Sequence, residues 1–287
     1  MNWLAVGLIT LISGGIAFWL SKPLVEMLSD TPLVASNYTG KRLPTAGGLL
    51  CWGAILATSA LGSVLQPFLQ SLFPTMTWPK WLPWDPWVIA LSSGFTLLGL
   101  LDDAAGDHRT RGFRAHLSAL WHRQWTTGGI KAAGGFALAL TMGFSLHSSW
   151  TLALLDALLI ALSANAINLL DLRPGRALKG FYFSSLIGLI LMEGKGAVTI
   201  LPFVGASLSF FPMDLRKRAM LGDSGANLLG AAFGLWAVLA LPLWGKGVLL
   251  ILLVFFHYWT SSHSLSAWID RHALLRRFDR WGTDSDL

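Results

Sequence analysis

The sequence is poor in charged residues, which make up only 13% of its 287 residues. Soluble globular domains carry about 25% charged residues, whereas 54% of this chain is hydrophobic. This composition excludes an ordinary soluble domain and indicates an integral membrane protein. Cysteine is scarcer still, since Cys51 is the only one. An intrachain disulfide framework and a metal cluster held by several cysteines are therefore both excluded.

The chain does contain long apolar runs. Nine of them come close to the roughly 20 residues that a helix needs to cross a bilayer. They cover residues 2–21, 46–66, 86–102, 128–146, 150–169, 180–193, 196–213, 224–243 and 246–262. The sixth run is short for a full span. No basic residue precedes the first run, so we expect a retained helix rather than a cleaved signal peptide.

The basic residues are distributed unevenly between the two sides of these runs. Eighteen of the 21 Lys and Arg follow odd-numbered runs or lie at their edges, and the other three are Lys80, Lys195 and Lys246. The positive-inside rule then places the N-terminus outside and the C-terminus in the cytoplasm. We predict an all-α polytopic protein of about nine transmembrane helices. Residues 1–287 form a single integral-membrane domain, with a cytoplasmic amphipathic tail at 263–287.

Two clusters of acidic and amide residues fall on the predicted cytoplasmic side. In "GLLDDAAGD" (99–107), Asp102 and Asp103 repel each other unless a cation or a proton separates them. This favours Mg²⁺ chemistry or a carboxylate base. In "NAINLLDLRPG" (165–175), Asn165, Asn168 and Asp171 recur at i, i+3 and i+6, roughly on one helical face. Their oxygens suit a hard cation.

A third cluster, "MLGDSGANLLG" (220–230), has the features of a helix start, with Asp223 and Ser224 as capping residues. A helix N-terminus attracts phosphate, but the negative Asp223 would then need a metal between them. A single carboxylate at a helix end is as often a solvated cap as part of a site. Three such clusters on one predicted face of the membrane favour a functional site over three separate helix caps.

Four segments occur in a familiar order: "KRLPTAGG" (41–48), "LLGLLDD" (97–103), "NAINLLD" (165–171) and "LGDSGANLLG" (221–230). Together they resemble the polyprenyl-phosphate N-acetylhexosamine-1-phosphate transferase superfamily. Its members include the phospho-N-acetylmuramoyl-pentapeptide transferase and the GlcNAc-1-phosphate transferases. The resemblance covers residues 38–230, and all four motifs lie on the predicted cytoplasmic face.

The resemblance implies a Mg²⁺-dependent phosphoglycosyl transferase of the bacterial plasma membrane, with its active site on the cytoplasmic face. Such an enzyme moves an N-acetylhexosamine 1-phosphate from a UDP-sugar to polyprenyl phosphate, releases UMP and starts a cell-envelope glycan. The matching positions imply a role for each residue. Asp223 and Asn168 would bind Mg²⁺, Asp102 and Asp103 would handle the lipid phosphate, Lys131 would neutralise a substrate phosphate, and Asn165 and Asp171 would shape the site. An interfacial lysine with a snorkelling ammonium is the alternative for Lys131.

The chain departs from these relatives after Asp171 and in its tail. The usual "NLxDGLDGL" pattern continues here as "LRPGRALKG", and the run of histidines in a late cytoplasmic loop is missing. Both differences argue against the pentapeptide substrate. In the tail, Leu274, Leu275, Phe278 and Trp281 form a helical apolar stripe beside several arginines. We predict an interfacial helix over the site, with Arg276 or Arg277 touching the UDP-sugar diphosphate.

Other classes of protein fit less well. A secondary transporter with a cytoplasm-facing acidic site is the main alternative, but the two halves of the chain show no internal repeat. A CDP-alcohol phosphotransferase is excluded because its DG…AR…G…D…D run is absent. A catalytically silent scaffold remains open. We expect the bilayer, polyprenyl phosphate and a UDP-sugar as partners, and no nucleic acid. The sequence leaves a homodimer open.

Overall fold

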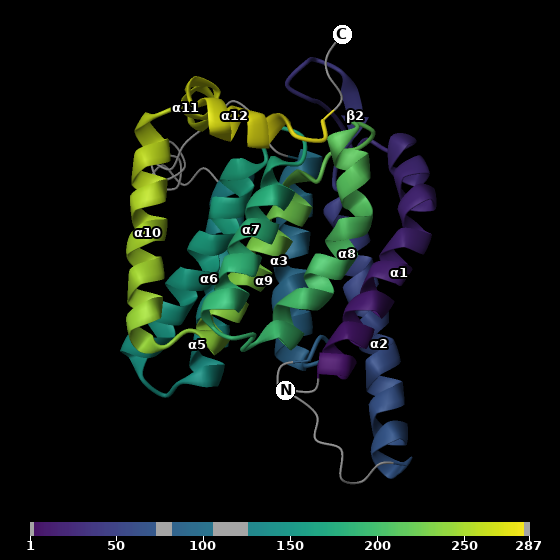
Figure 1. Ribbon diagram of the computed structural model, residues 1–287, viewed down its shortest axis with the longest axis vertical. Coiled ribbons are helices and arrows are strands. Elements are labelled where there is room, and N and C mark those ends of the chain that lie inside the picture. Colours follow the sequence, from purple (N-terminus) through teal and green to yellow (C-terminus); the bar gives the residue numbers. More distant parts are fainter. Residues whose placement is uncertain (1–2, 73–81, 106–125, 284–287) are drawn as a thin grey trace.

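The computed structural model describes residues 3–72, 82–105 and 126–283, and most of them are helical (Figure 1). The long helices are α1 (Trp3–Ser29), α2 (Gly48–Leu72), α3 (Pro86–Ala105), α5 (Thr127–Leu146), α6 (Trp150–Leu170), α7 (Arg176–Leu191), α8 (Ala197–Leu215), α9 (Gly222–Ala240) and α10 (Leu243–Ser262). Two short helices follow, α11 (Leu265–Arg271) and α12 (Ala273–Arg280). The all-α prediction is confirmed apart from one hairpin, formed by β1 (Val34–Ser36) and β2 (Arg42–Pro44) with Ala35 opposite Leu43.

Seven of the long helices in the described part of the chain are long and apolar enough to cross a membrane: α1, α2, α3, α5, α6, α8 and α10. The protein is therefore a multi-pass membrane protein. Each predicted run overlaps a helix, but α7 has only 16 residues and α9 begins with the polar sequence GDSGAN. Spans at 180–193 and 224–243 stay predictions.

The start of α1 and the pair α11–α12 lie at opposite ends of the bundle (Figure 1). Which end faces the cytoplasm stays a prediction. Asp107 of the first acidic cluster lies outside the described residues. So do five of the basic residues on which the topology prediction rests: Lys80, Arg109, Arg111, Arg114 and Arg123.

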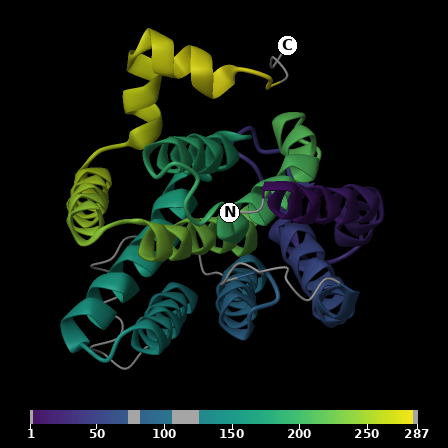
Figure 2. The same cartoon turned by 60° about the horizontal axis from the view of Figure 1, so that its bottom comes forward.

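Helix α9 lies inside the bundle, packed against α3 and α6 and also touching α2, α7 and α8 (Figure 2). Fifteen of its 19 residues are buried. Gly230 allows its close approach to α6, because a Cβ at this position would collide with the backbone of Ser163 and Ala164. The polar start of α9 is consequently held in place by helices on several sides.

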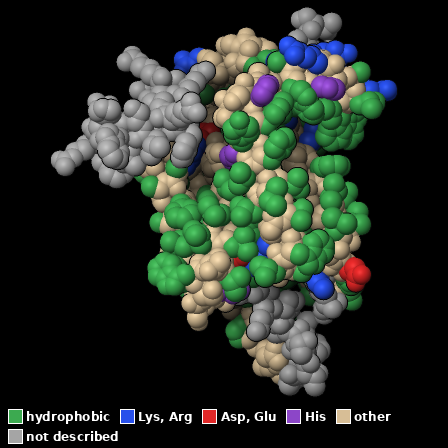
Figure 3. Space-filling view, turned by 90° about the vertical axis from the view of Figure 1, so that its left-hand side faces the viewer, with side chains coloured by type: hydrophobic (Ala, Val, Ile, Leu, Met, Phe, Trp, Pro, Cys, Tyr) green, Lys and Arg blue, Asp and Glu red, His purple; other side chains and the backbone are tan. Residues whose placement is uncertain are grey.

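Helix α10 stands at the edge of the bundle, and its outer surface is largely hydrophobic (Figure 3). At its first turn, the Lys246 ammonium lies 2.8 Å from the carboxylate of Asp156, which is fully buried in α6. His147 Nε2 lies 2.9 Å from the other oxygen of Asp156. A buried carboxylate requires such partners, so this cluster ties α10 to α6 far from the three acidic motifs. The position of Lys246 in the sequence indicates only a charge on the predicted outer side, and its pairing with Asp156 is a feature of the folded chain.

Candidate active site

Backbone hydrogen bonds bring the first and fourth sequence motifs side by side. The amide of Met220 donates to the carbonyl of Pro44 at 2.8 Å, and the amide of Gly47 donates back to the carbonyl of Met220 at 3.1 Å. The amide of Gly48 then donates to the carbonyl of Leu221 at 3.0 Å. The "KRLPTAGG" segment is therefore fixed against the turn that leads into α9.

Asp103 fastens α3 to the start of α9. Its Oδ1 accepts a hydrogen bond from the backbone amide of Asp223 at 2.9 Å, and its Oδ2 accepts one from the amide of Ser224 at 3.0 Å. Thr45 Oγ1 lies 3.4 Å from the same Oδ1. These amides belong to the first turn of a helix, where they have no partner within the helix. Asp103 thus acts as a capping residue from another helix, and its predicted catalytic role stays a prediction.

Lys131 lies between the carboxylates of Asp102 and Asp223. Its Nζ is 2.6 Å from Asp102 Oδ2 and also forms an ion pair with Asp223 Oδ2. The three side chains are 16%, 20% and 31% exposed, respectively, so a phosphate could still reach the group. The structure brings together the three residues that motif matching had assigned to one site. In this arrangement the ammonium neutralises two carboxylates rather than a substrate.

Asn168 places an unpaired oxygen beside this group. Its Nδ2 donates to Asp223 Oδ2 at 3.4 Å, while its Oδ1 is buried and has no hydrogen-bond partner. A buried acceptor without a partner is costly unless a ligand satisfies it. No group of three or more His, Cys, Asp or Glu side chains in the described residues could enclose a metal. The oxygens of Asn168 and Asp223 nevertheless fit Mg²⁺, which binds few protein ligands and keeps waters and substrate phosphates.

Asp171 follows directly after α6, of which it is the C-cap residue. Burial raises the pKa of its carboxyl group well above the usual range, and repulsion from Asp214, Asp223 and Asp103 raises the pKa further. The negative charges of the acidic cluster therefore act directly on the Asp171 carboxyl group. Asn165, by contrast, is exposed on α6. No hydrogen bond or ion pair among the described residues joins it to that cluster. The predicted roles of both residues stay predictions.

Arg276 and Arg277 are exposed on α12. Arg276 Nη1 donates to the backbone carbonyl of Asp270 at 3.0 Å, within the tail itself. No hydrogen bond or ion pair among the described residues joins either arginine to Asp102, Lys131 or Asp223. The helix predicted for the tail is confirmed over 273–280, while contact of these arginines with a diphosphate stays a prediction.

Sequence reasoning missed two residues that shape this region. Thr45 contacts Asp103, and its position inside the "KRLPTAGG" motif was the available signal. Asp214 is buried in α8 and accepts a hydrogen bond from the backbone amide of Gly175 at 2.8 Å. Nothing in its local sequence indicates a partner 39 positions away.

The arrangement defines a class of protein: a multi-pass membrane protein that gathers carboxylates, an amide and a lysine at one end of its bundle. The chain belongs to glycosyl transferase family 4, whose family model matches residues 86–241, more than half of its length. The match confirms the superfamily that the four motifs indicated. It includes the "LLGLLDD", "NAINLLD" and "LGDSGANLLG" segments and Lys131.

Similar curated proteins bear the name phospho-N-acetylmuramoyl-pentapeptide-transferase. The protein from Moorella thermoacetica is 29% identical over 74% of this chain and 65% of its own length. Proteins from Wolbachia sp. subsp. Brugia malayi and Wolbachia pipientis wMel are 26% and 27% identical, each over 70% of this chain and 61% of their own length. The chain therefore spans less than two thirds of the length of these relatives.

Proposed function

We propose that this protein transfers an N-acetylhexosamine 1-phosphate from a UDP-sugar to polyprenyl phosphate and releases UMP. The observation that carries the proposal is the unpaired Oδ1 of Asn168 beside the Asp102–Lys131–Asp223 group. The family match and the names of the relatives support the same class of chemistry. We further propose that the product starts a cell-envelope glycan in a bacterial plasma membrane.

Asn168 Oδ1 and Asp223 Oδ2 are the atoms that would hold Mg²⁺. The ion would neutralise the diphosphate and stabilise the departing UMP. The protein's own part is to align two anionic substrates, because phosphoryl transfer depends mainly on position and charge. An oxygen of the lipid phosphate forms a new bond to the phosphorus that carries the sugar, and the phosphorus–oxygen bond to UMP breaks.

Lys131 supplies a positive charge close to these phosphates. Its ammonium, shared by Asp102 and Asp223 in the structure, can turn toward an incoming phosphate when a metal takes over the charge of Asp223. The lipid phosphate needs little help in losing a proton, since the second pKa of a phosphate is about 6. Asp102 then serves to orient Lys131 rather than to act as a base.

The direct test is UMP release by purified protein supplied with undecaprenyl phosphate, Mg²⁺ and a panel of UDP-sugars. At least one UDP-N-acetylhexosamine should yield UMP in an amount that depends on both the lipid and Mg²⁺. If no UDP-sugar yields UMP, the transferase proposal is wrong. Uptake of a labelled solute into vesicles by the same preparation would favour the transporter.

Replacing Gly99 by alanine should lower this activity although glycine carries no functional group. A Cβ at Gly99 would collide with the backbone of Asp223 and Ser224, so α3 or the start of α9 must shift. A displacement of about 1 Å can cost on the order of 100-fold in rate. The control is Gly53→Ala on α2, because a Cβ there meets nothing within 4 Å. Equal rates for the two variants would mean that this contact does not position the site.

Cysteine labelling should place the site on the cytoplasmic face. A cysteine at Ala104, exposed at the end of α3, should react with a membrane-impermeant reagent only from the inside. A cysteine at Ser148, in the connection between α5 and α6, should react only from the outside. The native Cys51 is buried and should contribute no background. The reverse labelling pattern would invert the proposed topology and separate the site from cytoplasmic UDP-sugars.

A further inference from the structure

Two cations in the first turn of α7 are almost completely buried. Arg176 is 5% exposed and Lys179 is 4% exposed, although both follow the turn that leaves α6. Arginine and lysine are rarely buried in proteins without a partner. Their partners lie in the C-terminal tail, about 100 positions further along the chain.

Arg176 binds both short helices of the tail. Its Nε and Nη2 donate to the two carboxylate oxygens of Asp279 at 2.7 and 2.8 Å, and its Nη1 donates to Ser266 Oγ at 2.8 Å. A bidentate arginine–carboxylate pair is strong and fixes the relative orientation of its partners. Arg176 consequently fastens α11 and α12 to α7.

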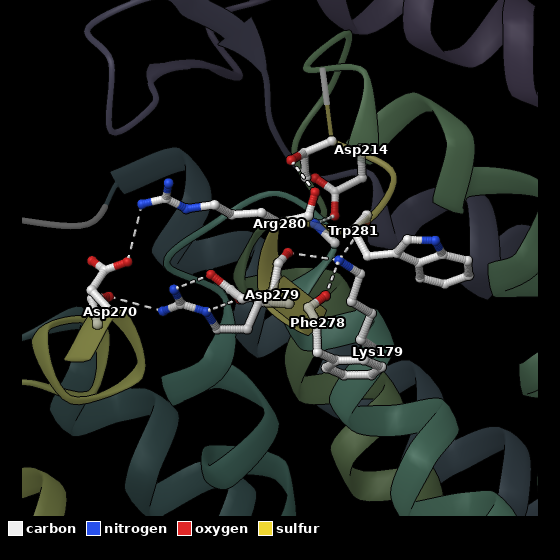
Figure 4. Close-up of polar contacts among 11 residues, drawn as sticks. Lys179, Asp214, Asp270, Phe278, Asp279, Arg280 and Trp281 are labelled. Carbon is white, nitrogen blue, oxygen red and sulfur yellow. Dashed lines mark hydrogen bonds and ion pairs between the residues drawn. The ribbon is translucent and has the colours of Figure 1, made fainter. Parts of the chain in front are cut away.

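Lys179 caps the end of α12. Its Nζ donates to the backbone carbonyls of Phe278, Asp279 and Trp281 at 3.1, 2.7 and 2.7 Å (Figure 4). Carbonyls at a helix C-terminus have no partner within the helix and carry partial negative charge, which a cation satisfies. We call Arg176, Lys179 and Asp279 the tail latch.

Apolar packing contributes little to the attachment of α12, which has no buried residue. A cavity of about 220 Å³ lies between α7 and the tail, lined mainly by apolar side chains that include Leu170, Trp268 and Phe278. The tail latch is therefore the principal link between α12 and the bundle.

The tail latch and the candidate active site share one short segment of chain. Asn168 lies in the last turn of α6, Asp171 caps that helix, and Arg176 begins α7. Between them, Gly175 has a positive φ of 72° and its amide is held by Asp214. Asp214 and Arg176 thus hold one end of the turn, and the other end leads directly to Asp171, so a movement of Arg176 would be passed along this short segment to Asp171 and Asn168.

We propose that the tail is a positioning element of the transferase site, in which Asp279, acting through Arg176, holds the 171–175 turn and thereby Asp171 and Asn168. This inference rests on the proposed function. Asp279 is a positioning residue, since its carboxylate is engaged by Arg176 rather than directed at a substrate. The turn itself is short and irregular, so its own residues do little to fix its position. The tail latch supplies the contacts that hold it.

The test compares Asp279→Asn with Asp270→Asn in otherwise intact protein. Asp279→Asn should lower kcat for UMP release by about 10- to 100-fold and leave KM for the UDP-sugar nearly unchanged, because the reacting geometry is altered rather than ground-state binding. Amide hydrogen exchange over residues 171–176 should become faster. Asp270→Asn should behave like the parent, since Asp270 pairs with the exposed Arg280 at 3.3 Å.

Two conservative variants guard against a simple failure to fold. Asp279→Glu keeps the carboxylate and should restore much of the lost kcat. Arg176→Lys keeps the charge but loses the bidentate geometry. It should also lower kcat, by a smaller factor than Asp279→Asn. Unchanged kcat in Arg176→Lys and in Asp279→Asn would overturn the inference, whatever their exchange rates.

The kinetic constants separate this inference from its alternatives. A rise in KM with unchanged kcat would assign the tail to binding of the nucleotide, through Arg276 and Arg277, and would also overturn positioning by Asp279. If the parent itself releases no UMP with any UDP-sugar, the proposed function fails. Hydrogen exchange then decides separately whether Asp279 holds the 171–175 turn.

Discussion

Replacing Asp223 by alanine should lower Mg²⁺-dependent UMP release by about 100- to 1,000-fold, the range seen when one electrostatic contact to a transition state is lost. The Asp223 carboxylate contacts both Lys131 and Asn168, so its removal takes one ligand from the proposed metal and the hydrogen-bond acceptor of the Asn168 amide. Purified variant and parent should be compared at several Mg²⁺ concentrations.

The Asp223→Ala protein should still fold. Lys131 keeps its pair with Asp102, and Asp103 binds the backbone amides at the start of α9 rather than the Asp223 side chain. Glu26→Ala is the matched control, because Glu26 is an acidic residue in an exposed pair with Lys22. A rate for Asp223→Ala close to that of the parent would mean that the metal binds elsewhere.

Replacing Lys131 by methionine should have the second-largest effect, on both activity and stability. Without the ammonium, the carboxylates of Asp102 and Asp223 face each other with no cation between them. In Mg²⁺-free detergent the variant should lose about 2 kcal/mol of stability, less than when a fully buried pair is broken, because the three side chains are partly exposed. Activity should fall by about 100-fold.

Added Mg²⁺ should raise the Tm of Lys131→Met more than the Tm of the parent. The ion would supply the missing positive charge between the two carboxylates. Lys22→Met is the control, since the Lys22 side chain is 82% exposed and its pair with Glu26 lies outside the site. Equal Mg²⁺ responses in parent and Lys131→Met would contradict a metal site at Asp223.

Hydropathy located the helices but not their ends. Each predicted apolar run overlaps a long helix, yet the run at 2–21 belongs to a helix that continues to Ser29, and the run at 46–66 belongs to one that reaches Leu72. Hydropathy reports which residues suit the hydrocarbon of a bilayer, whereas a helix ends where its backbone hydrogen bonds are terminated. The extra turns at the end of α1 carry the exposed Lys22–Glu26 pair.

The residues of the candidate site were accessible to motif recognition, and their contacts were not. Asp102, Lys131 and Asp223 lie 29 and 92 positions apart along the chain, so no local periodicity indicates that one ammonium joins the two carboxylates. The sequence also gives no indication that Asp102 and Asp103 contact different partners. Asp103 is turned toward the amides of α9 and Asp102 toward Lys131, because neighbouring residues on a helix point in different directions.

Composition, apolar runs and four ordered motifs were enough to determine that this is a helical membrane protein of a particular transferase family. The tertiary structure decided which charges act together. Lys131 lies among the site carboxylates, whereas Arg176 and Lys179 are turned away into the tail. In a low-dielectric interior a charge must pair with whichever opposite group folds beside it. For Arg176 that group is Asp279, 103 positions away, which only the folded chain brings into contact.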